Sequence, residues 1–122
     1  MQLARLEELE AFITADGSSI RELAHPSWTA ARNQSLAEAT VPPAGETAEH
    51  FHPQAEEIYY FVAGSGRMRL GESDEAPVQA GDCVVIAPGT PHKLWNTGDR
   101  PLVLLCSCAP AYSHHDTVLT GR

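Results

Sequence analysis

Basic side chains are scarce in this 122-residue sequence, which has eight Lys and Arg residues against sixteen Asp and Glu and a formal net charge of −8. Nucleic acids and anionic membrane surfaces are bound through clustered Lys and Arg side chains. The deficit argues against both, so we expect neither a nucleic-acid nor a membrane partner. The acidic excess alone indicates no more than a soluble surface.

Long apolar runs and paired cysteines are also missing. A membrane-spanning helix needs about 20 consecutive apolar residues, and the N-terminal segment MQLARLEELEAF is charged where a secretory leader is apolar. The three cysteines are odd in number, and Cys106 and Cys108 are too close along one strand to suit a disulfide. We therefore expect Cys83, Cys106 and Cys108 to be buried, reduced thiols in a cytoplasmic protein.

The sequence contains many short β-rich segments separated by turns. The segment 2–12 has leucines spaced by three, which permits a short amphipathic helix or turn. A Gly-Ser-Gly turn is expected to fold 57–62 back onto 67–70 as a hairpin, and the acidic residues 71–77 are expected to form a loop. Further strands are predicted at 20–23, 35–41, 50–52, 83–86, 92–96 and 102–108. This pattern predicts an all-β fold, a sandwich or barrel, in a single domain over 1–122.

Two histidines, His50 and His52, stand two residues apart in one of the expected strands. Side chains alternate between the faces of a strand, so both imidazoles point the same way, about 7 Å apart at their roots. This geometry suits two ligands of one metal ion. A His-x-His pair can equally be a chance surface pair, so the argument for a site needs further ligand-type residues.

Glu57 and His92 are such residues. Glu57 opens the apolar segment EIYYFV, where a carboxylate is otherwise disfavoured, and His92 follows a stiff Pro-Gly-Thr-Pro turn. Imidazole nitrogen and carboxylate oxygen together suit Fe, Mn, Ni, Co or Zn rather than Ca or Mg. The pattern favours a site for one divalent transition metal ion.

The spacing of these residues resembles two motifs of the cupin family, which together cover residues 45–96. The first motif is a glycine, His-x-His, a glutamate and a second glycine, here Gly45, His50, His52, Glu57 and Gly64. The stretch 81–96, GDCVVIAPGTPHKLWN, resembles the second motif, with His92 and Asn96 in its histidine and asparagine positions. We expect Asn96 to be structural and hydrogen-bonded near the following turn.

The resemblance implies a single-domain jelly-roll β-barrel of six to eight strands, whose metal ligands are His50, His52, Glu57 and His92. The sequence departs from the pattern at Ala87, where the second motif has a proline, although Pro88 and Pro91 keep the turn stiff. Glu56 competes with Glu57 for the carboxylate role. Only Glu57 has six residues between itself and Gly64, so we expect Glu56 to face solvent.

Alternation along the strands predicts the surroundings of the ion. Tyr59 is the only obvious proton donor and the candidate catalytic residue, although filling the barrel is an alternative role. The candidates for the substrate pocket are Phe61, Met68, Leu94 and Cys106, of which Cys106 could also be a small buried hydrophobe. With no Arg or Lys expected inside, we expect a small substrate that binds the ion through paired oxygens rather than a phosphorylated one.

The same rule places Lys93 and Trp95 on the outside, with Arg67 and Arg69. Ile58, Tyr60 and Trp95 are then expected to form one apolar set on the outer surface. Such a set is commonly covered by a second subunit, and cupins are commonly dimers, so we expect a homodimer. The polar tail, with its three ligand-type residues 114–116, is expected to lie at the surface.

Three kinds of function fit such a site. The first, which we favour from the sequence, is a mononuclear-metal oxygenase acting on a small oxygen-chelating substrate. The second is a redox-neutral isomerase, epimerase, cyclase or lyase that works through a metal-stabilised enolate. The third is a non-catalytic module that binds a metal or small ligand, because one fold serves many functions.

Overall fold

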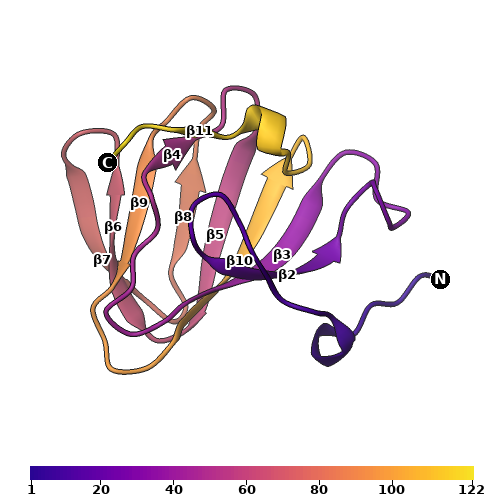
Figure 1. The fold of residues 1–122 in the computed structure, drawn as a ribbon, viewed down its shortest axis with the longest axis horizontal. Helices are drawn as coiled ribbons and strands as arrows, with labels where there is room; N and C mark the ends of the chain where they lie inside the picture. Colours follow the sequence, from indigo (N-terminus) through magenta and orange to yellow (C-terminus); the bar gives the residue numbers. More distant parts are fainter.

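The computed structural model describes residues 1–122 and consists almost entirely of antiparallel β-strands in two facing sheets (Figure 1). The first sheet has the order β1-β2-β3-β10-β5-β8, with strands Phe12–Ile13, Ser19–Ala24, Ser35–Val41, Leu102–Ala109, Glu56–Ala63 and Cys83–Ile86. The second has the order β11-β4-β9-β6-β7, with strands Val118–Leu119, His50–Phe51, His92–Asn96, Ser65–Leu70 and Asp74–Gln79. The expected all-β jelly roll is confirmed. Its eleven strands exceed the six to eight that the family resemblance implied, because three of them have only two residues.

The predicted hairpin between 57–62 and 67–70 is wrong. Strand β5 pairs with β10 and β8, whereas β6 pairs with β7 and β9, so the turn between β5 and β6 carries the chain from one sheet to the other. Gly64 makes this turn with a φ of +86°, and a Cβ there would lie 2.6 Å from the carbonyl oxygen of Pro101. Only glycine tolerates both conditions.

The acidic segment 71–77, predicted as a loop, instead provides most of strand β7 at the edge of the second sheet. Every residue of β6 from Ser65 to Leu70 has a partner in β7. Five of the six β7 side chains are exposed, and only Val78 is buried. Acidic side chains and a proline are typical of edge strands, where they prevent further strand pairing.

The two terminal segments of the chain differ in how they join the sheets. The N-terminal segment forms one exposed turn of 3₁₀ helix, Leu6–Glu8, before β1. The C-terminal tail, expected to be a surface segment, forms a second 3₁₀ turn, His114–Asp116, and then pairs with β4 through β11. No helix in the structure has the length and apolar composition needed to cross a membrane.

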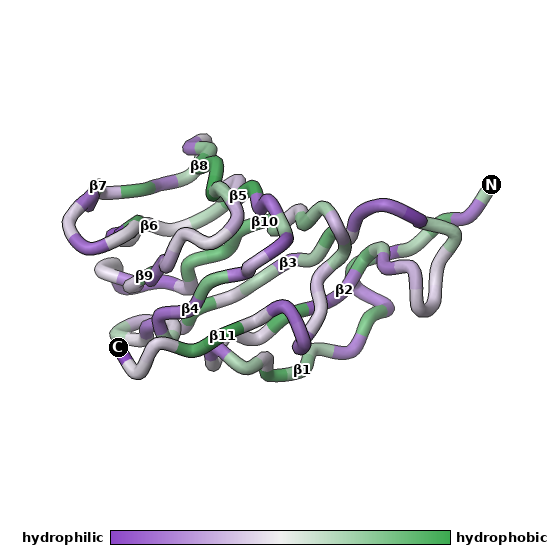
Figure 2. Tube along the Cα trace, turned by 90° about the horizontal axis from the view of Figure 1, so that it is seen from above, coloured by the Kyte–Doolittle hydropathy of each residue, from purple (hydrophilic) through white to green (hydrophobic).

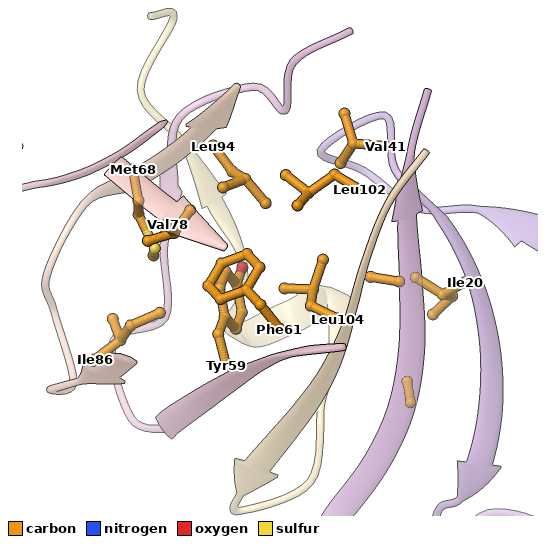
Figure 3. Close-up of a cluster of buried hydrophobic side chains, with 12 residues drawn as sticks. Ile20, Val41, Tyr59, Phe61, Met68, Val78, Ile86, Leu94, Leu102 and Leu104 are labelled. Carbon is orange, nitrogen blue, oxygen red and sulfur yellow. The ribbon is translucent and has the colours of Figure 1, made fainter. Parts of the chain in front are cut away.

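The hydrophobic core lies between the two sheets (Figure 3). Phe61 and Leu104 from the first sheet meet Met68 and Leu94 from the second, and Phe61 is fully buried. Along β5, burial alternates from residue to residue between Glu56 and Val62, as the period of two requires. The hydrophobic strands β5, β8 and β10 lie together in one layer (Figure 2).

The predicted outer apolar set is wrong in one member. Ile58 and Tyr60 face outward from β5 in the first sheet, but Trp95 belongs to β9 in the second sheet. Trp95 is covered by cationic side chains, with the Arg67 guanidinium 4.1 Å from its ring. Lys93, expected to be exposed, is 8% exposed because the C-terminal tail covers it.

Candidate metal centre

Four side chains meet at one open end of the barrel. His50 begins β4, His52 follows β4, His92 begins β9, and Glu57 comes from β5 in the opposite sheet. His50 and His92 are direct register partners. One nitrogen or oxygen atom from each of the four side chains lies within 4.8 Å of every other, and all four residues are buried. The structure therefore brings together the four residues that the sequence singled out.

Each imidazole is oriented by a backbone carbonyl. Nδ1 of His50 donates to Ala48, Nδ1 of His52 to Asp116 and Nδ1 of His92 to Thr90, each at 2.9 Å. A carbonyl oxygen can only accept, so the proton sits on Nδ1 and the lone pair sits on Nε2. Metal-binding histidines are commonly fixed in this way.

The carboxylate of Glu57 is held from one side. The Cys108 thiol donates to its Oε2 at 3.0 Å. Its Oε1 lies 3.3 Å from Nε2 of His52 and 3.2 Å from Nε2 of His92. While both imidazoles are neutral, neither contact is a hydrogen bond, because both nitrogens then present lone pairs to the oxygen.

These contacts leave three buried atoms without a hydrogen-bond partner: Nε2 of His52, Nε2 of His92 and Oε1 of Glu57. Buried polar atoms are rarely left unpaired, because each costs roughly 1–3 kcal/mol. Ligands bound about 2.1 Å from one ion at right angles lie about 3 Å apart. The separations of 3.2 and 3.3 Å fit a cation between the three atoms.

The site also shifts the pKa values of its own members. Burial lowers the pKa of His50, so this imidazole stays neutral. For His52 burial acts in the same direction, but the contacts with Glu57 and Asp116 outweigh it and raise its pKa. Burial would raise the pKa of Glu57, yet the nearby His52 and His92 lower it strongly, so the carboxylate is ionised.

A small cavity adjoins three of the four side chains, His50, His52 and Glu57. Its volume is about 50 Å³, on a measure where one water needs roughly 10–15 Å³. Three of the residues predicted from the sequence, Tyr59, Leu94 and Cys106, line it. Phe61 and Met68, also expected there, lie in the core instead, because the barrel is filled by side chains below its open end. Burial raises the pKa of both Tyr59 and Cys106, so each keeps its proton.

Two acidic residues of the cavity were not found from the sequence. Asp16 comes from the turn between β1 and β2, and Glu22 comes from β2 itself. Alternation along the segment 20–23 indicated that Glu22 and Ile20 share a face, but which face is buried became clear only when β2 was placed in the sheet. No Arg or Lys lines the cavity.

The polar residues outside the cavity have structural roles. Asn96 donates from Nδ2 to the carbonyls of Val41 and Arg100 and accepts from the amide of Gly98, as expected. The side chains of His114 and His115 are exposed. Cys83, expected to be buried, is exposed on the outer face; all three cysteines are free.

The Pro-Gly-Thr-Pro turn keeps its role despite the alanine at its start. The amide of Gly89 donates to the carbonyl of His52 at 2.8 Å, and the carbonyl of Thr90 accepts from His92. The turn closes with a bond from the Thr90 amide to the Ala87 carbonyl, which any residue provides. One turn therefore contacts two of the four site histidines.

Two facing antiparallel sheets with three histidines and a glutamate at one end define a jelly-roll protein of the cupin class. A family model described as the cupin domain matches residues 37–108. The chain belongs to this family. An uncharacterised protein of Methanocaldococcus jannaschii is 47% identical over 111 residues, which cover 91% of this chain and 88% of that protein.

Solved structures of similar proteins include enzymes. The formate complex of oxalate decarboxylase from Lactobacillus farciminis superposes with a TM-score of 0.79 at 26% identity, covering 95% of this chain and 35% of that one. This chain thus spans about a third of that enzyme. The polyketide cyclase RemF from Streptomyces resistomycificus gives a TM-score of 0.82 at 22% identity, covering 98% and 85%. At that identity the likeness concerns the fold alone.

Proposed function

We propose that His50, His52, Glu57 and His92 hold one divalent transition metal ion, and that the chain is an enzyme for a small substrate that binds this ion through oxygen atoms. The observation that carries the proposal is the convergence of three unpaired buried atoms at one point. A bound ion would polarise a carbonyl or carboxylate group of the substrate. Four protein ligands leave room for such a group on a five- or six-coordinate ion.

We further propose that the reaction is redox-neutral, of the isomerase, epimerase, cyclase or lyase kind. Such reactions need a side chain that moves a proton, and Glu22 lines the same cavity. Burial raises the pKa of Glu22, opposed in part by His25, so its proton is held closer to neutral pH than that of an ordinary glutamate. Tyr59, the candidate catalytic residue from the sequence, offers a hydroxyl that stays protonated.

An oxygenase, which we favoured from the sequence, draws its reactivity from the ion and dioxygen, whereas a redox-neutral enolate reaction depends on moving a proton. The extra carboxylates therefore support the redox-neutral alternative over it. The named relatives are compatible with this choice, since they include a decarboxylase and a cyclase.

The experiment begins with metal-free protein, reconstituted under anaerobic conditions with Fe(II), Mn(II), Ni(II), Co(II) or Zn(II) in turn. Each form is screened with small hydroxy, keto and dicarbonyl acids with and without oxygen. The proposal expects one bound ion per chain and turnover that does not require oxygen. Oxygen uptake coupled to turnover would establish the oxygenase instead. Stoichiometric metal binding with no turnover would support a binding module, and no metal binding would refute the metal centre.

We also propose that two copies of the chain meet through the outer face of the first sheet. The support is a set of exposed apolar side chains on β3, β5 and β8 of this sheet, namely Leu36, Ile58, Tyr60, Val62 and Val85. Register pairs Ile58 with Val85, so the cluster runs continuously from β5 onto β8. An apolar face of this kind is typical of an interface.

A further inference from the structure

The cavity beside the candidate metal centre has acidic walls. Besides Glu57, its lining includes two more carboxylates, Asp16 and Glu22, and no Arg or Lys side chain. The cations of the second sheet lie on its outer face, where Arg67, Arg69 and Lys93 surround Trp95. The charge of the cavity is therefore set by the carboxylates and by whatever the site binds.

One carboxylate oxygen of Asp16 accepts three hydrogen bonds, and the other accepts none. Its Oδ1 accepts from the Thr14 hydroxyl at 2.7 Å, from the Ser18 amide at 2.9 Å and from the Ser18 hydroxyl at 2.6 Å. These three bonds hold the turn between β1 and β2 rigidly. Its Oδ2 makes no hydrogen bond and lies 3.8 Å from Nε2 of His50, so it faces the candidate centre as a free acceptor.

Glu22 is a second free acceptor. Its side chain is 5% exposed, and its Oε1 lies 3.7 Å from Nε2 of His25. That nitrogen already donates to the carbonyl of Tyr112 at 2.8 Å, and Nδ1 of His25 accepts from the Ser27 amide. Both ring nitrogens of His25 are thus hydrogen-bonded to backbone groups, and no group of the protein donates a hydrogen bond to the carboxylate of Glu22. Because Glu22 lines the cavity, its carboxylate is available to a donor group that enters there.

On the basis of the proposed function, we propose that the substrate carries a hydrogen-bond donor, an ammonium or hydroxyl group, at the end opposite its metal-binding oxygens. A divalent ion with Glu57 and Asp16 has no net charge, so the occupied centre offers nothing to neutralise a second negative group on the substrate. A dianion would place like charges together in a poorly hydrated space. A donor group satisfies Asp16 and Glu22 instead.

The test uses three probes with the same oxygen-chelating hydroxamate head. β-Alanine hydroxamate carries an ammonium group, propionohydroxamate carries a methyl group, and succinate monohydroxamate carries a carboxylate. Their dissociation constants are measured on the Co(II)-loaded chain from its visible absorption, after the metal content of each sample has been determined. We expect the ammonium probe to bind at least tenfold more tightly than the carboxylate probe, with the methyl probe between them.

The variants Asp16→Asn and Glu22→Gln keep the shape and remove the charge, and each is expected to reduce this ratio several-fold. Glu38→Gln is the control, since Glu38 lies on the outer face of the same sheet, paired with Arg21, and it should leave the ratio unchanged. Equal binding of the three probes, the opposite order, or a ratio unaffected in both cavity variants would overturn the substrate class alone. A chain that takes up no Co(II) would overturn the proposed function together with this inference.

Discussion

The backbone carbonyl of Asp116 accepts a hydrogen bond from Nδ1 of His52, 64 residues earlier in the chain, at 2.9 Å. The carboxylate of the same residue accepts from the amides of Gln54 and Ala55, both at 2.9 Å. A residue of the C-terminal tail therefore orients one candidate ligand and fixes the loop that leads to another. Such partners of ligands commonly change metal affinity by about 10–100-fold when they are lost.

Replacing Asp116 by alanine tests this relationship. The Asp116→Ala variant loses two hydrogen bonds to the loop after β4, so its carbonyl is no longer held against His52. We expect metal affinity to fall about tenfold, measured by competition with a metal-buffering chelator. His115→Ala in the same 3₁₀ turn is the control, because the His115 side chain is exposed. Equal affinities in the two variants would show that the tail does not position His52.

The two adjacent glutamates of β5 allow a matched comparison. Glu57 is buried with its Oε1 at the centre, whereas Glu56 is exposed on the other face of the strand. Glu57→Gln is expected to reduce metal affinity by more than about 100-fold, because a neutral amide replaces an anionic ligand. Glu56→Gln should have the affinity of the unmodified chain. Metal content after dialysis, measured by mass spectrometry, distinguishes the two variants. Loss of metal in Glu56→Gln alone would show that Glu56, and not Glu57, is the ligand.

Metal affinity is expected to fall as the pH is lowered. The pKa of His52 is raised above its ordinary value of 6.5, so in the metal-free protein its Nε2 takes up a proton already above that pH. A proton on Nε2 blocks the lone pair that the ion needs, and affinity should drop about tenfold per pH unit below the raised pKa. His50, whose pKa is lowered, should add to the loss only at more acidic pH. A titration from pH 8 to 5 would contradict this if affinity stayed constant down to pH 6.

Two phenylalanines allow a core position to be compared with a surface position. Phe61 is fully buried between the sheets, and Phe12 is 42% exposed on β1. Phe61→Ala leaves a cavity and should lower the free energy of unfolding by about 3–5 kcal/mol, whereas Phe12→Ala should lower it by less than about 1 kcal/mol. Urea unfolding followed by circular dichroism measures both. Similar losses in the two variants would mean that β1 packs more tightly than its exposure indicates.

The proposed dimer depends on the outer face of the first sheet. Tyr60→Lys places a charge in the middle of the exposed cluster on β5 and β8 and should convert a dimer into a monomer in sedimentation velocity. Trp28→Lys is the control, because Trp28 is 58% exposed outside the strands of that sheet. If the unmodified chain is a monomer, the proposed interface does not exist. If the dimer survives Tyr60→Lys but not Trp28→Lys, the interface lies elsewhere on the molecule.

Local sequence was sufficient to predict those strands for which the alternation of side chains and the flanking turn residues indicate the same bounds. The strands 35–41, 83–86 and 92–96 were predicted with their observed bounds, because alternation and flanking Pro or Gly residues are local properties. Strand β7 was missed since its acidic side chains resemble a loop and only backbone pairing with β6 makes it a strand. The hairpin error has a similar origin, because a turn does not reveal whether the next strand stays in the same sheet.

The sequence by itself determined the residue types of the candidate site and the fold class, because the spacing of His50, His52, Glu57 and His92 resembles the two cupin motifs. It could not assign Asp16, Glu22 or Asp116 to that site. Their places depend on which face of β2 is buried and on where a tail of twelve residues crosses the barrel. Those contacts join segments far apart in the chain, so only the packing of the two sheets decided them.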